Sequence, residues 1–222
     1  MIFPKLKNKK FGYLNLDLEG KKWVKENTST FKDFEKNPLI EPAVCLKMVE
    51  EMHRKFDLDF SYGGWLEDRS FLWKDSYLED EGLFIHLGID ISVDPGTEVA
   101  IDFDAQVVLV DDDYPEIGGW GPRVIVKNLE KGFYVIYAHL DRKILCKVGE
   151  RLPKGSVFAR AGKAPYNGNW WPHIHVQVIE ASFYESLSKT GLMELDGYGN
   201  SLELENFVKA FRDPLCCIRL AD

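Results

Sequence analysis

Two histidines one residue apart form the most chemically suggestive pattern in this chain. His173 and His175 stand in the run WWPHIHVQ at residues 170–177, at the head of a strand-like segment, and the whole chain has only five histidines. Side chains at positions i and i+2 of a strand point to the same face. The two imidazoles therefore share a face, which suits metal binding or proton transfer; a solvated strand face that carries two histidines is the alternative.

A second pair of candidate groups lies upstream, in the segment His86-Leu87-Gly88-Ile89-Asp90. Four residues of a straight strand span about 13 Å, which is too far for both side chains to reach one ion at about 2 Å each. Gly88 lies at the midpoint and permits a bend that would bring them together. Two histidines and a carboxylate form a common catalytic zinc set with water as the fourth ligand. A hydrogen-bonded histidine and aspartate without metal is the alternative.

The elements that must position these residues form a β-rich region that begins near residue 82. Short runs such as LFIHLGIDISV, AQVVLV, RVIVKN, FYVIYAHL and HIHVQVIE alternate with turn residues. Strands at this spacing favour an antiparallel sandwich or barrel. His139 lies at the end of one of these runs, so that four of the five histidines fall in the β-rich region.

Taken in order, the motifs H-x-G-x-D, Y-A-H-L and P-H-x-H resemble those of the lysostaphin/LytM-type zinc metallopeptidases, often called peptidoglycan endopeptidases. The resemblance runs from about Leu83 to Glu180. It includes the run Gly96-Thr97-Glu98-Val99-Ala100, where the family has G-T-P-V-x-A, and a glycine-bracketed turn between Gly149 and Gly155.

The resemblance implies a role for each matching residue. His86, Asp90 and His175 would bind one zinc ion, with water as the fourth ligand, and His139 and His173 would be the catalytic histidines beside it. Zinc lowers the pKa of a bound water toward about 7 and polarises a carbonyl group. Because the chain has no H-E-x-x-H motif, a histidine or the aspartate must handle the proton.

The chain departs from the family pattern around its H-x-H pair. The family commonly continues with Phe-Glu, but Val176-Gln177 follows here. Two tryptophans precede Pro172 where small residues are usual, which would narrow the groove; a role as buried core aromatics is the alternative. We therefore assign to a substrate groove the residues Asn169, Trp170, Trp171 and Tyr137.

The remaining segments predict a three-part organisation. Residues 1–80 form a mixed α/β extension, residues 81–182 the metallopeptidase β-core and residues 183–222 a C-terminal helical segment. Within the extension, alternation over residues 11–20 predicts a half-buried strand, residues 42–56 an amphipathic helix and residues 60–68 a loop. We expect the aromatic-rich extension to dock on the β-core and to narrow the access to the metal.

Composition limits the partners. A formal net charge of −8 argues against general binding of nucleic acid. No apolar run is long enough to span a membrane. The N-terminus lacks the pattern of a signal peptide, so we expect a cytoplasmic protein; export with a leader missing from this sequence is the alternative. The four cysteines show no C-x-x-C spacing, and free thiols are the simplest expectation. The oligomeric state is not predicted.

The function expected from these observations is that of a zinc-dependent endopeptidase. Its substrates would be peptide bonds between small residues, in the cross-bridges or stem peptides of peptidoglycan. Two alternatives remain at this stage: an intracellular zinc hydrolase of another amide, and a non-catalytic binding or regulatory domain on the same fold.

Overall fold

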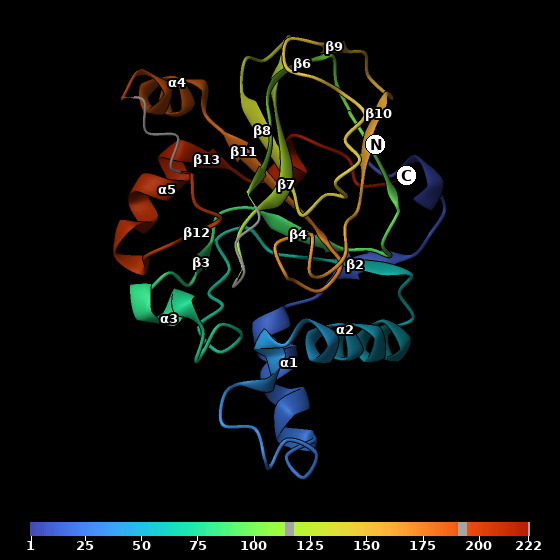
Figure 1. The fold of residues 1–222 in the computed structure, drawn as a ribbon, viewed down its shortest axis with the longest axis vertical. Coiled ribbons are helices and arrows are strands. Elements are labelled where there is room, and N and C mark those ends of the chain that lie inside the picture. Colours follow the sequence, from blue (N-terminus) through green and yellow to red (C-terminus); the bar gives the residue numbers. More distant parts are fainter. Residues whose placement is uncertain (114–117, 191–194, 222) are drawn as a thin grey trace.

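A large β-sheet forms the centre of the protein in a computed structural model that describes residues 1–113, 118–190 and 195–221 (Figure 1). All of its strand pairs are antiparallel except the pair between β1 and β2, which is parallel. In order across the sheet the strands are β1 (Phe11–Tyr13), β2 (Phe60–Gly63), β4 (Ile89–Ser92), β11 (Ile174–Ile179), β8 (Tyr134–Ala138), β7 (Gly121–Asn128), β6 (Ala105–Asp113) and β9 (Arg151–Leu152), and β13 (Phe211–Arg212) pairs with β11.

Strand β11 shows how the sequence pattern determines the sides of this sheet. Alternate residues of a strand face opposite sides. Ile174, Val176 and Val178 face the main hydrophobic core. His175 and Gln177 face the other side, and both are buried as well. The strand is therefore covered on both faces, and its polar face lies inside the protein.

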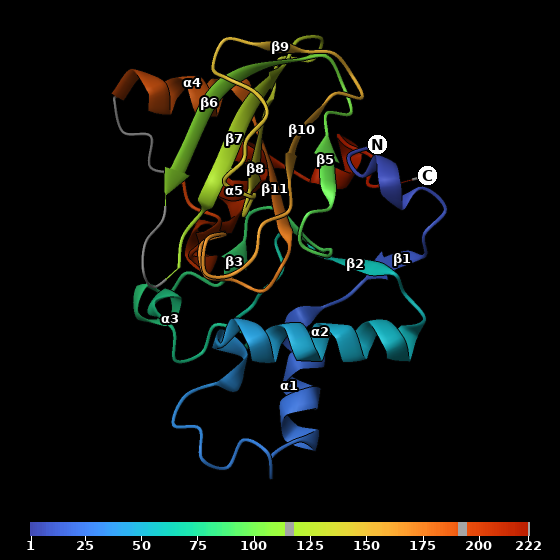
Figure 2. The ribbon, with the colours of Figure 1, turned by 45° about the vertical axis from the view of Figure 1, so that its right-hand side comes forward.

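A second layer packs against the sheet. The short strands β5 (Glu98–Ala100) and β10 (Val157–Arg160) pair with each other and form this layer. A separate pair, β3 (Ile85–His86) with β12 (Tyr198–Gly199), lies on the opposite face, where Ile85 clusters with Ile125 and Ile136. The main core contains Val99 and Phe158 from the second layer together with Ile91 and Val124 from the large sheet. The prediction of a mainly β fold with a sandwich-like core is therefore confirmed (Figure 2).

The N-terminal segment adds helices and two strands to the β-core. Its helices are α1 (Leu16–Glu26), α2 (Pro42–Phe56), α3 (Tyr77–Glu81) and two short 3₁₀ turns, η1 (Pro4–Leu6) and η2 (Pro38–Ile40). Helices α1 and α2 lie together at one end of the molecule (Figure 2). A separate cluster of buried side chains, including Trp23, Met48 and Trp73, holds them. The strands β1 and β2 extend the large sheet beyond β4.

Two predictions for this segment are correct only in part, and one is confirmed. The strand predicted for residues 11–20 ends at Tyr13, because Asn15 accepts a hydrogen bond from the Leu18 backbone N–H at 2.8 Å and starts a helix instead. The loop predicted for residues 60–68 begins with β2, whose residues pair with β4. The helix predicted for residues 42–56 is α2, with Pro42 in its first turn.

The C-terminal segment is only partly helical. It contains α4 (Ala181–Thr190), η3 (Ser201–Glu203), α5 (Leu204–Ala210) and η4 (Pro214–Cys216), but also the strands β12 and β13. Asn200 caps the turn that leads into α5 by accepting a hydrogen bond from the Leu202 N–H at 2.9 Å. Residues 191–194 of the predicted helical segment lie outside the described residues.

The two ends of the chain meet on one side of the core. The backbone N–H groups of Ile2 and Phe3 donate to the carbonyl oxygens of Arg219 and Leu220 at 2.8 and 3.1 Å. The four cysteines are free thiols, as expected. Among the described helices, none combines the length and the apolar character that crossing a membrane requires.

Candidate active site

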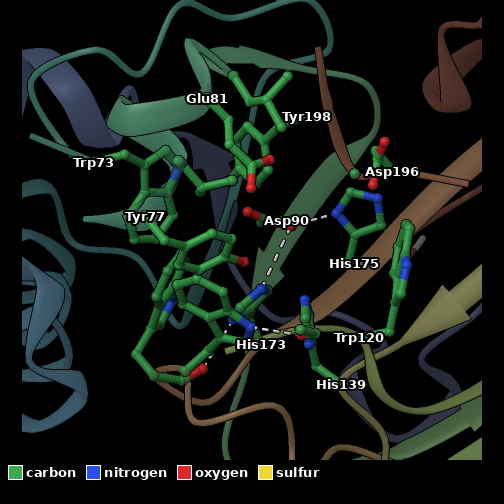
Figure 3. Close-up of a pocket in the computed structure, with 16 residues that line it drawn as sticks. Trp73, Tyr77, Glu81, Asp90, Trp120, His139, His173, His175, Asp196 and Tyr198 are labelled. Carbon is green, nitrogen blue, oxygen red and sulfur yellow. Dashed lines mark hydrogen bonds and ion pairs between the residues drawn. The ribbon is translucent and has the colours of Figure 1, made fainter. Parts of the chain in front are cut away.

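Neighbouring strands bring Asp90, His139, His173 and His175 to one place (Figure 3). In the sheet, His175 of β11 lies opposite Asp90 of β4 on one side and opposite Ala138 of β8 on the other. His139 follows Ala138 directly, and His173 precedes β11. The register of three adjacent strands therefore gathers four of the five predicted residues.

An interruption of the strand around Gly88 brings the fifth residue, His86, to the same place. Strand β3 ends at His86 and β4 begins at Ile89, so the two strands are not continuous. His86 Nε2 consequently lies 3.2 Å from Asp90 Oδ1. A Cβ atom at Gly88 would lie 2.7 Å from His175 Nε2, so the bend leaves no room for a side chain. Glycine here permits both the bend and the close packing on His175.

Three of these side chains form a set that could hold a metal ion. One ligand atom each from His86, Asp90 and His175 lies within 4.8 Å of the other two. His175 Nδ1 lies 3.0 Å from Asp90 Oδ1 and 3.1 Å from His86 Nε2. All three residues are at most 2% exposed. Buried imidazole and carboxylate groups at this spacing are the donor types that zinc prefers.

Outer hydrogen bonds fix which ring nitrogen faces the centre of this set. The Gly64 carbonyl oxygen can only accept, so His86 Nδ1 donates to it at 3.0 Å and His86 Nε2 keeps its lone pair. The Gln177 amide donates through Nε2 to the Asp196 carbonyl at 3.2 Å, which turns its Oε1 toward His175 Nε2 at 3.0 Å. His175 therefore presents the lone pair of Nδ1.

These lone pairs explain why the set fits a cation. His86 Nε2, His175 Nδ1 and Asp90 Oδ1 all face one another as acceptors, without a hydrogen atom between them. Such an arrangement is repulsive unless a cation lies among them. Outer hydrogen bonds of the same kind orient the imidazole ligands of metal sites. The residues of this structure thus fit the zinc ion that the family resemblance implies.

His139 and His173 stand beside the donor set with their own tautomers fixed. His139 Nδ1 donates to the Asn167 carbonyl at 2.9 Å, and His173 Nδ1 donates to the Trp171 carbonyl at 2.8 Å. Their ring centres are 4.4 Å apart. His173 Nε2 lies 3.5 Å from Asp90 Oδ1. Both residues line the same cavity, and both keep an Nε2 lone pair for proton transfer.

The protonation states that metal binding requires are built into this environment. Burial, together with the positive charge of Arg69, lowers the pKa of His86 to about 4. Burial also lowers the pKa of His173 to about 4, and it lowers the pKa of His139 well below its usual range. Burial alone would raise the pKa of Asp90, but the adjacent imidazoles and Arg69 hold it well below its usual value. At neutral pH these imidazoles are neutral and the carboxylate is ionised.

Arg69 is the site residue that sequence reasoning missed. It is fully buried, and its Nη1 donates to Asp90 Oδ2 and, at 2.9 Å, to the Tyr198 hydroxyl. Its Nε donates to Glu67 at 2.9 Å. In the sequence it stands in the charged run Glu67-Asp68-Arg69, which is typical of an exposed loop. In the sequence, only the paired glycines before that run, Gly63 and Gly64, indicate that another group could pack closely against the backbone there.

The cavity over the donor set has a volume of about 180 Å³, and three parts of the chain line it. The N-terminal segment supplies Trp73, Tyr77 and Leu78, the β-core supplies Glu81, Trp120 and Trp170, and the C-terminal segment supplies Asp196, Gly197 and Tyr198. Figure 3 shows these side chains around Asp90 and the histidines. The cavity is therefore bounded by aromatic rings, with carboxylates at its edge.

The four predicted groove residues separate into two pairs. Trp170 and Trp171 line the cavity, and the Trp171 ring stacks on His173 with 4.0 Å between centres. Tyr137 does not belong there, because it lies opposite Val176 on the core side of the sheet and packs against Phe158. Asn169 is not among the lining residues either.

The buried asparagine of that loop is Asn167 instead. It is fully buried, and its backbone carbonyl is the one that accepts from His139. Its side chain donates to the Trp170 carbonyl at 3.2 Å and accepts from the Trp170 N–H at 3.2 Å. The Asn-Gly pair at residues 167–168 is a turn signal in the sequence, but it does not reveal that the turn holds His139 in place.

Comparisons with known proteins give a family match for the part of the chain that carries the site. The model of peptidase family M23 matches residues 84–186. Among solved structures the chain is similar to the catalytic domain of the antimicrobial peptidase lysostaphin from Staphylococcus simulans, with 19% identity over 60% of this chain and 79% of that chain and a TM-score of 0.42. It is also similar to a catalytic-domain mutant of the prophage-encoded M23 protein EnpA from Enterococcus faecalis, with 23% identity over 43% of this chain and 68% of that chain and a TM-score of 0.37.

A zinc containing peptidase from Vibrio cholerae is similar as well, with 26% identity over 43% of this chain and 27% of that chain and a TM-score of 0.35. The comparison with curated proteins finds no match. The family match covers every strand that carries a predicted donor, from β3 to β11. Residues 84–186 therefore match peptidase family M23, and this match supports a metallopeptidase.

Proposed function

We propose that this protein is a zinc-dependent endopeptidase that hydrolyses peptide bonds between small residues, of the kind found in peptidoglycan. The observation that carries the proposal is the buried set of His86, Asp90 and His175, whose lone pairs face one another around a space that a cation would fill. Zinc bound there would lower the pKa of a water molecule and polarise the carbonyl of the scissile bond.

The catalytic histidines would supply the proton transfers. His139 and His173 are neutral because burial lowers their pKa values, and each holds its Nδ1 proton on a backbone carbonyl. Each Nε2 can therefore accept a proton or a hydrogen bond inside the cavity. The two lone pairs stand side by side, so that one histidine can take a proton while the other holds the reacting group in place.

The shape of the cavity supports slim substrates. It holds about 180 Å³, and rigid rings such as Trp73, Trp120 and Trp170 form its walls. Trp170 is held in place because its Nε1 donates to the Gly119 carbonyl at 2.7 Å. A peptide with small side chains would fit between such rings, whereas bulky side chains would collide with them. The cross-bridges and stem peptides of peptidoglycan are rich in such residues, and the family match favours them as substrates.

The test measures metal content and cleavage together. The protein is loaded with zinc, and its cleavage of purified peptidoglycan, glycine-rich peptides and unrelated small amides is measured with and without a chelator. We expect one zinc ion per chain, chelator-sensitive cleavage of the first two substrates, and no cleavage of the third. His175→Ala should lose both zinc and activity; if this variant kept stoichiometric zinc, the ligand assignment would be wrong.

The outcomes also separate the alternative functions. Cleavage restricted to the small amides would indicate a zinc hydrolase with another substrate. Stoichiometric zinc without cleavage of any substrate would favour a binding domain on the same fold. The complete set of ligands and catalytic histidines in this chain argues against that last outcome.

A further inference from the structure

We infer that Arg69 is a positioning residue for Asp90, so that the N-terminal segment is part of the metal centre rather than only a cover over it. The inference rests on the proposed metal-binding function of His86, Asp90 and His175. Arg69 lies outside residues 84–186, the part of the chain that matches the family.

The two carboxylate oxygens of Asp90 have separate partners. Oδ1 faces the imidazoles, at 3.0 Å from His175 Nδ1 and 3.2 Å from His86 Nε2. Oδ2 faces away from them and accepts a hydrogen bond from Arg69 Nη1. A carboxylate held in this way offers one oxygen to a cation and keeps the other occupied. Arg69 therefore determines which oxygen of Asp90 is available and in which direction it points.

Arg69 is itself held by partners within the N-terminal and C-terminal segments. Its Nε donates to Glu67 Oε2 at 2.9 Å, and Glu67 Oε1 accepts from the Tyr13 hydroxyl at 2.7 Å. Its Nη1 also donates to the Tyr198 hydroxyl at 2.9 Å. On the side of Nη2, Gly63 has no side chain, and a Cβ atom there would collide with the guanidinium. The orientation of the guanidinium is thus fixed from several directions.

The charges around Arg69 make this arrangement compatible with a cation. A buried positive charge next to a metal site would repel the metal if nothing opposed it. Glu67, whose side chain is 4% exposed, lies on the opposite side of the guanidinium and offsets its charge. Arg69 can then orient Asp90 at a smaller electrostatic cost to metal binding.

Stability alone gives a weak reason for this buried arginine. Among the described residues its Nη2 has no hydrogen-bond partner, although it is buried. A buried ion pair with an unsatisfied donor is often no more stable than an apolar replacement of similar volume. Orienting the metal ligand Asp90 would explain the presence of this buried arginine, which stability does not explain.

The experiment compares zinc affinity in matched arginine variants of the full chain. Arg69→Lys keeps the positive charge, but a compact ammonium cannot hold Asp90, Tyr198 and Glu67 with the fixed fork of a guanidinium. We expect its zinc affinity, measured by competition with a chromogenic chelator, to fall by about tenfold or more. Arg212→Lys is the control, because Arg212 makes a two-point ion pair with Glu180 away from the cavity; its zinc affinity should stay within about twofold of the parent.

A spectroscopic measurement separates positioning from general destabilisation. In the cobalt-substituted protein the visible spectrum reports the geometry of the ligands, and we expect it to change in Arg69→Lys but not in Arg212→Lys. If Arg69→Lys does not fold, Glu67→Gln answers the same question, because it keeps the arginine while it weakens the contact that holds Nε and removes the charge that offsets the guanidinium. Its zinc affinity should fall in the same direction, by a smaller factor.

The failures are distinguishable. A parent protein that binds no zinc would overturn the proposed function. A parent that binds zinc, with folded Arg69→Lys equal to it in affinity and in cobalt spectrum, would overturn the positioning role and leave the metal site intact. If Arg69→Lys does not fold and Glu67→Gln does, a zinc affinity of Glu67→Gln equal to that of the parent would overturn the positioning role of Arg69.

Discussion

The part of the chain that matches the family and the segments outside it make different contributions to one cavity. Residues 84–186 supply all the predicted metal ligands and both catalytic histidines. The segments before and after them supply walls, such as Trp73, Tyr77 and Asp196, and the arginine that holds Asp90. The groups that could do chemistry therefore come from the family core, whereas part of the cavity wall and the arginine that holds Asp90 come from the segments outside it.

This difference has a physical basis in the sheet. Strands β4, β11 and β8 fix the positions of Asp90, His175 and His139 through their register, which leaves little freedom for variation. The edge of β4 is paired with β2 from the N-terminal segment. An unpaired strand edge invites aggregation unless another element covers it. Additions at this edge can cover the strand and at the same time place new side chains beside the metal ligands.

Of the changes considered, removing the N-terminal segment should have the largest effect on solubility and zinc binding. A truncated chain that begins at Glu81 loses β1 and β2, exposes the edge of β4, and removes Phe3 and Phe60 from the main core. We expect it to be insoluble or to bind no zinc, as measured by yield of soluble protein and by metal content. A soluble truncation with full zinc content and an unchanged range of substrate sizes would show that residues 1–80 are only an appendage.

Substituting the catalytic histidines tests the other side of the comparison. His139→Ala and His173→Ala should keep one zinc ion per chain, because neither residue belongs to the ligand set, but should lose about 10²- to 10⁴-fold in turnover. Peptide cleavage and metal analysis of the same preparations provide the measurement. Loss of zinc in either variant would move that histidine into the ligand set, and near-normal turnover in both would remove them from the mechanism.

The family core was largely predictable from the sequence because its signals are local. The histidine pair at positions i and i+2, the possible bend at Gly88 and the alternating β-runs indicate which residues could lie close together. The resemblance to the metallopeptidase family then supplied the ligand set and the catalytic roles. The structure brings His86, Asp90, His139, His173 and His175 together. Tyr137 was misplaced because its position on a strand does not tell which of the two faces looks toward the cavity.

The additions were less predictable because their roles depend on distant contacts. Arg69 contacts Asp90, which is 21 residues away, and Tyr198, which is 129 residues away. Nothing in the local pattern of residues 67–69 separates a buried ion pair from a solvated charge run. The strand predicted for residues 11–20 failed for a different reason: a single asparagine cap at Asn15 outweighed the alternation and started α1.

The smallest expected effect concerns the stability of the metal-free protein as the pH falls. The pKa values of His86 and His173 are about 4 in the folded protein, against 6.5 for an ordinary histidine. Between pH 6.5 and 4 the unfolded chain therefore binds more protons than the folded chain, so the free energy of unfolding decreases as the pH is lowered. The low pKa of Asp90 does not oppose this trend, because its stabilising effect is lost only below about pH 4.

Each histidine could contribute a loss on the order of 3 kcal/mol across this interval. Denaturant unfolding of the chelator-treated protein at pH 6.5, 5.5 and 4.5 measures it, and His173→Gln, which has one titrating group fewer, should show a shallower decline. The decline depends on both regions, because the family core supplies the imidazoles, while the additions help to bury them and Arg69 lowers the pKa of His86 further. If the free energy of unfolding did not change between pH 6.5 and 4.5, the imidazoles would be freely accessible to water. That result would contradict an enclosing role for the added segments.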